Sequence, residues 1–94
     1  MNNAVYIAVK APLNNPIDPH LCRIGISNGT QIIDGGWVLY SSVSTNNSED
    51  SEAIRAHILK LLQGAIYDAE NKAWFLPPEV IDYWMRERAD DFRR

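Results

Sequence analysis

Apolar residues in the first half of the chain gather in short runs that lack helical spacing. The first run, residues 4–9 with the sequence AVYIAV, contains β-branched and aromatic members and predicts a buried strand. Residues 21–27 and 37–44 have the same character. We therefore expect strands over these three segments, because such residues pack well on a pleated surface.

Turn-forming residues separate these runs. Residues 11–20 hold three prolines and two asparagines, which exclude a helix or a central strand and predict a loop. Asn28 and Gly29 are a strong hairpin signal, and they predict a short returning strand over residues 30–33. Gly25 lies inside the second predicted strand, where a glycine marks a bulge or a close approach to the backbone.

The second half of the chain changes to helical spacing. An apolar stripe recurs every three or four residues, at Ile54, Ile58, Leu61, Leu62 and Ala65. Ser48 or Ser51 is expected to cap this helix, which we expect to run to about Gln63 with Gly64 as its stop.

A charged connector over residues 67–72 and a short apolar segment over 73–76 follow the first helix. Pro77 and Pro78 then open a second helix. One side of that helix is expected to carry Val80, Ile81, Trp84, Met85 and Arg88. Strands first and helices afterwards predict the α+β class: a small antiparallel sheet of three to four strands, followed by two helices packed on it.

Composition narrows the class of protein. The chain has 94 residues, 46% of them hydrophobic and 22% charged, which excludes disordered, collagen-like and coiled-coil proteins and predicts one domain over 1–94. Nine basic against twelve acidic residues give a net charge of −3. Any contact with nucleic acid is therefore expected to come from a local patch.

The chain shows no signal peptide and no apolar run of membrane-spanning length, so we expect a cytoplasmic protein without membrane contact. Its one cysteine, Cys22, excludes an internal disulfide. Asp18, His20 and Cys22 alternate along the chain and form a weak metal-ligand pattern. The simpler interpretation makes Cys22 a small hydrophobic residue on a strand.

Several polar and aromatic residues have both a structural and a chemical interpretation. His57 lies at the rim of the apolar stripe. It is either a half-buried histidine at the edge of the core, or a general base or a group that contacts a phosphate. Glu49 and Glu52 favour the positive end of the helix dipole or bind a metal ion. Trp37, Trp74 and Trp84 are core residues or base-stacking platforms. Arginines near the C-terminus are diluted by acidic neighbours, which favours a solvated helix end.

One pattern joins these points. The segment VYI at 5–7 and the segment RIGIS at 23–27 resemble the two short strands that name the GIY-YIG nuclease superfamily. A third strand, an acidic helix start, His57 and the segment AWF at 73–75 before a last helix follow in the order found in the compact bacterial and phage branch.

The resemblance implies a GIY-YIG-like sheet flanked by helices, and hydrolysis of DNA assisted by Mg²⁺ or Mn²⁺. By position, Tyr6 matches the tyrosine of the first motif and Gly25 the glycine of the second. Glu52, or less well Glu49, is the nearest match to the metal-binding glutamate.

The sequence also departs from that family. Arg23 stands where the second motif has a tyrosine, residues 28–36 contain no arginine and are too short for the family's helix, and Ala73 replaces a common glutamate. Arg23 and Arg55 are the candidates to supply the missing positive charge. We therefore expect an eroded catalytic set, with nucleic-acid or protein binding and weak or no metal-dependent endonuclease activity.

Two further interpretations stay open. One is a non-catalytic accessory protein, of the phage or plasmid type, that binds a larger host protein. The other is a structural subunit of an oligomer, held by an exposed strand edge or an aromatic patch.

Overall fold

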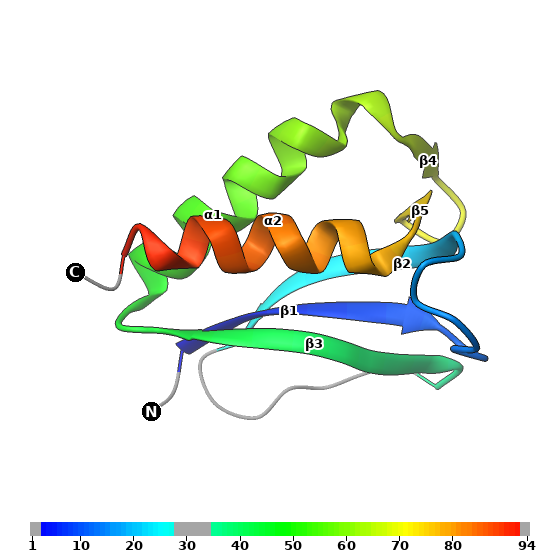
Figure 1. Ribbon diagram of the computed structural model, residues 1–94, viewed down its shortest axis with the longest axis horizontal. Coiled ribbons are helices and arrows are strands. Elements are labelled where there is room, and N and C mark those ends of the chain that lie inside the picture. Colours follow the sequence, from blue (N-terminus) through cyan, green and yellow to red (C-terminus); the bar gives the residue numbers. More distant parts are fainter. Residues whose placement is uncertain (1–2, 28–34, 93–94) are drawn as a thin grey trace.

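One antiparallel sheet with both helices on the same face forms the fold (Figure 1). The computed structural model describes residues 3–27 and 35–92. The elements, in chain order, are β1 (Asn3–Lys10), β2 (His20–Ser27), β3 (Trp37–Thr45), α1 (Ser48–Leu61), the 3₁₀ turn η1 (Leu62–Gly64), β4 (Ile66–Asp68), β5 (Ala73–Leu76) and α2 (Pro78–Asp90). The strands are ordered β3-β1-β2-β5-β4 across the sheet.

The α+β class is confirmed, with the sheet larger than expected. β4 and β5 form a hairpin that adds two strands to the sheet and separates the two helices along the chain. The expected apolar segment is the strand β5, while the expected connector contributes its first two residues to β4 and then forms the turn between the two strands. Both strands are so short that they carry little periodic signal. The expected strand over 30–33 lies outside the described residues.

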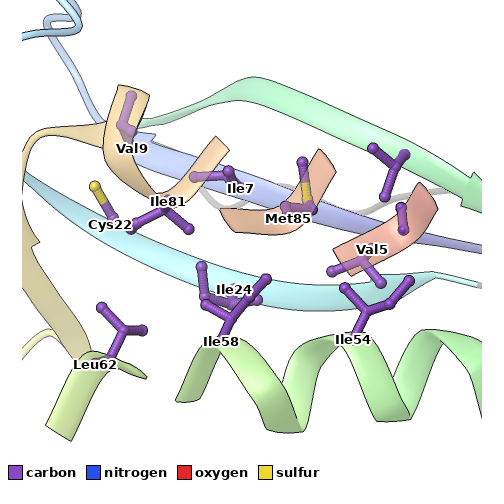
Figure 2. Close-up of a cluster of buried hydrophobic side chains, with 12 residues drawn as sticks. Val5, Ile7, Val9, Cys22, Ile24, Ile54, Ile58, Leu62, Ile81 and Met85 are labelled. Atoms are coloured by element: carbon purple, nitrogen blue, oxygen red, sulfur yellow. The ribbon is translucent and has the colours of Figure 1, made fainter. Parts of the chain in front are cut away.

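The core lies between the sheet and the helices. Val5, Ile7 and Val9 of β1 are fully buried and face the helices. Figure 2 shows side chains of both helices, among them Ile58 and Met85, pointing into the same cluster. Successive side chains of a strand point to opposite faces, which places the residues between those of β1 on the face away from the helices.

Each helix buries a line of residues spaced four apart. In α1 this line is Ile54 and Ile58, continued by Leu62 at the start of η1, and in α2 it is Ile81, Met85 and Ala89. A neighbour one position away is turned by about 100° around the helix. For this reason Leu61 and Val80, both expected in the apolar stripes, are exposed by 41% and 38%.

The start of α1 differs from the expected cap. Asn47 is the N-cap, and its side-chain oxygen accepts a hydrogen bond of 2.8 Å from the backbone N–H of Asp50. Ser48 is already the first residue of the helix. Ser51 is fully buried and hydrogen-bonds with the hydroxyl of Thr45 at 2.6 Å, so it ties α1 to β3.

Cys22 is a small core residue, as the simpler interpretation predicted. It is fully buried on β2, and burial raises the pKa of its thiol to about 12. The described residues contain no group of three or more His, Cys, Asp or Glu side chains placed to share a metal ion, so Asp18, His20 and Cys22 do not form a set of metal ligands.

No helix among the described residues has the length and apolar character that are needed to span a membrane.

Candidate functional site

A pocket of about 660 Å³ opens where β2 extends past the β4–β5 hairpin. In the described residues, the pairing between β2 and β5 covers only the first three residues of β2, His20–Cys22. Beyond them β2 is approached by α1 instead, and the Nε of Arg55 donates a long hydrogen bond of 3.5 Å to the carbonyl of Ile24. The pocket is thus built by residues of β1, β2 and β3, by one helix and by the hairpin.

Tyr6 and Gly25 form the floor of the pocket. They are cross-strand partners of β1 and β2, so they lie on the same face of the sheet. A Cβ atom built on Gly25 would overlap the ring of Tyr6. The glycine therefore lets the tyrosine ring lie flat across the neighbouring strand, a role that suits a glycine inside a strand.

We expect Gly25→Ala to push the Tyr6 ring off the strand and to lower stability by about 1–2 kcal/mol, the usual cost of overpacking. The Tyr6 ring signals in an NMR spectrum and a urea unfolding curve measure both effects. Gly64→Ala is the matched control, because a Cβ at Gly64 meets no atom of the described structure within 4 Å apart from its chain neighbours and the backbone of its own turn. Unchanged Tyr6 signals in Gly25→Ala would contradict the close approach.

Arg23 joins the sheet to the turn of the hairpin. Its guanidinium stacks 3.8 Å from the centre of the Trp37 ring. Its Nε and one terminal nitrogen donate hydrogen bonds of 3.1 Å and 2.9 Å to the backbone carbonyl of Asn71. Lys10 also donates to this residue, at 3.2 Å to its side-chain oxygen. These contacts fix the turn against the face of the sheet that the helices leave uncovered.

Asp68 organises the same turn from within. One carboxylate oxygen accepts backbone N–H bonds from Glu70 and Asn71 at 3.0 Å and 3.3 Å. The other accepts from the side-chain amide of Asn71 at 3.0 Å. Lys72 then takes a φ of 52°, which turns the chain back into β5. The positions of Glu70 and Lys72 in the pocket therefore depend on the Asp68 carboxylate.

The turn is expected to loosen in acid. The Asn71 side-chain hydrogen bond, followed by the backbone bonds, lowers the pKa of Asp68 below its ordinary value. The ionised form thus stabilises the turn above the unfolded pKa of about 3.9, and this contribution is lost as pH falls through the lower native pKa. Amide signals of Glu70 and Asn71 should report the loss. In Asp68→Asn, which does not titrate, the acid response should disappear, and its persistence would contradict this assignment.

The described residues that line the pocket have a net positive charge, whereas the whole chain has a net negative charge. Among the described residues that line it, Arg23, Arg55 and Lys72 are cationic, and Glu70 is the one carboxylate. The chain as a whole carries a net charge of −3. The pocket is therefore a local basic patch on an acidic protein, and such a patch attracts anions.

Aromatic side chains accompany these charges. Trp37, Tyr67 and Trp74 all line the pocket. The ring centres of Tyr67 and Trp74 lie 5.0 Å apart with their planes tilted by 54°. Tyr67 is 50% exposed, so part of its ring is accessible to a planar ligand.

The fold brings together five of the seven residues singled out from the sequence. Tyr6, Arg23, Gly25, Arg55 and Trp74 all line the pocket. Glu52 and His57 do not: Glu52 is exposed on α1, and His57 is half-buried on the same helix. Two positions separate His57 from Arg55, about 200° around a helix, so Arg55 and His57 point in opposite directions.

Sequence reasoning missed three pocket residues that the hairpin supplies, and it left Trp37 open between a core residue and a base-stacking platform. Tyr67, Glu70 and Lys72 fall in the segment interpreted as a connector. The one available signal is the place of these residues in a charged segment between two predicted elements, because binding residues are often carried by such connections.

The pocket residues fit the expected divalent ion poorly. Mg²⁺ prefers octahedral oxygen ligands and is usually held through one or two carboxylates together with substrate phosphates. Glu70 is the single carboxylate among the described lining residues, and it shares the pocket with three cations. The described lining residues are therefore poorly suited to hold Mg²⁺ or Mn²⁺.

Comparison with protein-family models finds no match, and searches of curated proteins and of solved structures likewise find none. The resemblance to the GIY-YIG superfamily thus remains a hypothesis.

Proposed function

We propose that this protein binds DNA at the pocket, through unpaired bases and the phosphates that flank them. The observation that carries the proposal is the combination of three cationic side chains with accessible aromatic rings, on a chain of net negative charge. Proteins that bind single strands use this combination, in which a basic groove follows the backbone and rings stack on the bases.

The two groups of side chains suit the two parts of a nucleotide. Tyr67 and Trp74 offer rings from the hairpin, where stacking contributes about 1–3 kcal/mol per base. Arg55 and Lys72 offer charge from α1 and from the turn, where charge-assisted hydrogen bonds to phosphate are strong. Bases within a duplex are already stacked, so the rings favour unpaired DNA.

Removing one pocket cation should weaken binding and its dependence on salt. We expect Lys72→Asn to bind a short fluorescein-labelled oligothymidine about threefold to tenfold more weakly. The slope of log K against log salt should fall by about 0.7, the value for one phosphate contact on a single strand. Asparagine tolerates the positive φ of Lys72. Lys60→Asn, an exposed change on α1 outside the pocket, is the matched control, and equal effects of both changes would contradict the site.

We further propose that cleavage of the bound DNA is weak or absent. Three observations support this: Glu52 and His57 lie outside the pocket, Arg23 is engaged with Asn71 and Trp37, and a single carboxylate lines the site in the described part of the chain. Incubation of supercoiled plasmid with the protein and Mg²⁺ or Mn²⁺ tests the proposal. Rapid nicking that disappears in Tyr6→Phe and in Glu70→Gln would overturn it and establish a nuclease.

A further inference from the structure

A second concave surface lies on α2, away from the pocket. Ile17, Pro77, Val80 and Tyr83 line a groove of about 390 Å³, together with Glu79. None of these residues lines the DNA pocket. Ile17 and Tyr83 are 61% and 63% exposed, so large apolar side chains are held in solvent here. Exposed apolar side chains gathered in a groove mark interaction surfaces.

The loop that carries Ile17 is fixed to α2. The backbone N–H of Glu79 donates to the carbonyl of Pro16 at 3.2 Å. Asn15 accepts from the backbone N–H of Ile17 at 3.2 Å and, through its carbonyl, from that of Asp18 at 3.0 Å. The groove is therefore largely formed before any ligand arrives, which reduces the entropy that binding must overcome.

The border of the groove is acidic. An adjoining depression shares Glu79 and Tyr83 with it and adds Asp82, Arg86, Glu87 and Asp90. Arg86 lies 3.0 Å from Asp82, so these two charges offset each other. Glu79 and Glu87 are exposed and lie on the same side of α2, about 12 Å apart along the helix axis.

We propose that this surface, the α2 groove, binds a basic segment of another protein. The segment places one apolar side chain between Ile17, Val80 and Tyr83, and its Lys or Arg side chains lie over Glu79 and Glu87. An apolar anchor inside a charged rim is the usual anatomy of a specific protein interface. The complementary charges select a basic partner and speed its association.

The test uses the full chain and a labelled helical peptide in which leucine and lysine alternate at helical spacing, with a twin in which glutamate replaces lysine. We expect the basic peptide to bind and to shift the amide signals of Ile17, Val80 and Tyr83, while the acidic twin does not bind. Two results overturn the proposal: failure of the basic peptide to bind, and binding that shifts signals across the whole surface.

Matched variants separate a specific site from general charge. Glu79→Lys with Glu87→Lys should weaken peptide binding at least about tenfold. Glu49→Lys with Glu52→Lys, which makes the same change in net charge on exposed positions of α1, should leave binding within about twofold. Equal losses in both pairs would overturn the proposal.

The apolar anchor has its own control. Ile17→Ser should weaken peptide binding several-fold, and Ile66→Ser, at a position exposed to a similar extent on β4, should not.

Sedimentation of the free protein tests the other possible occupant of the groove, a second copy of the chain. A dimer that Ile17→Ser dissociates would show that the groove is filled by self-association and would overturn the basic partner. Oligothymidine binding should be unchanged in the Glu79 and Glu87 pair and in Ile17→Ser, so these measurements test the DNA proposal independently of the α2 groove.

Discussion

Ile58→Ala is expected to destabilise the protein by about 3–4 kcal/mol. Ile58 is fully buried at the centre of the core and packs between α1 and the sheet (Figure 2). The substitution removes buried methyl groups and leaves a cavity that the surrounding side chains fill only in part. For a small domain this is a large share of a total stability of about 5–15 kcal/mol.

Urea unfolding followed by circular dichroism measures the effect. Leu61→Ala, one turn later on the same helix and 41% exposed, is the control and should change stability by less than about 1 kcal/mol. Comparable losses in the two variants would contradict the buried line through Ile54, Ile58 and Leu62. The comparison therefore tests how α1 is rotated on the sheet, and with it the direction of Arg55.

The double variant Arg55→Gln with Lys72→Asn should bind oligothymidine about a hundredfold more weakly than the unaltered protein. Each cation is expected to contact a phosphate and to contribute about a factor of ten, or about 1.4 kcal/mol, so the loss of both gives about a hundredfold. The two residues come from different elements, α1 and the turn before β5. The loss of affinity in the double variant therefore tests whether both sides of the pocket contact the DNA. Glutamine keeps much of the arginine stem and limits the effect on packing.

Fluorescence anisotropy at fixed salt gives the affinity. Lys60→Asn with Arg86→Gln removes an equal number of positive charges, from positions outside the pocket. This control pair should weaken binding by no more than about twofold. A hundredfold loss in that control pair would show that net charge alone governs binding, and the pocket would then have no special role.

The first three strands and the two helices could be predicted from the sequence because their patterns are local. Alternating burial along β1 and four-residue spacing along α1 both follow from the geometry of one element. The β4–β5 hairpin could not be predicted in this way. Ile66–Asp68 and Ala73–Leu76 are too short for a periodic signal, and they are strands because each finds a partner.

The same difference between local pattern and tertiary contact decides which residues of the candidate site could be predicted from the sequence. Tyr6 and Gly25 lie in two strands with a clear apolar pattern, and the register of these strands makes them cross-strand partners. Glu70 and Lys72 depend on a turn whose shape comes from Asp68, Asn71 and a positive φ. Glu52 and His57 are candidates because of their place on a predicted helix and the family resemblance, but the direction in which a helix side chain points depends on packing against the sheet.

The three tryptophans provide the most direct test of the central claim, that DNA binds at the pocket. Trp37 and Trp74 line the pocket, whereas Trp84 lies on α2 and packs against the core. Each indole N–H gives its own NMR signal, so a titration of the full chain with oligothymidine contains an internal control. The account predicts that the Trp37 and Trp74 signals shift as the oligonucleotide binds and that the Trp84 signal does not. A shift confined to Trp84, or no shift in any of the three at saturation, would contradict it.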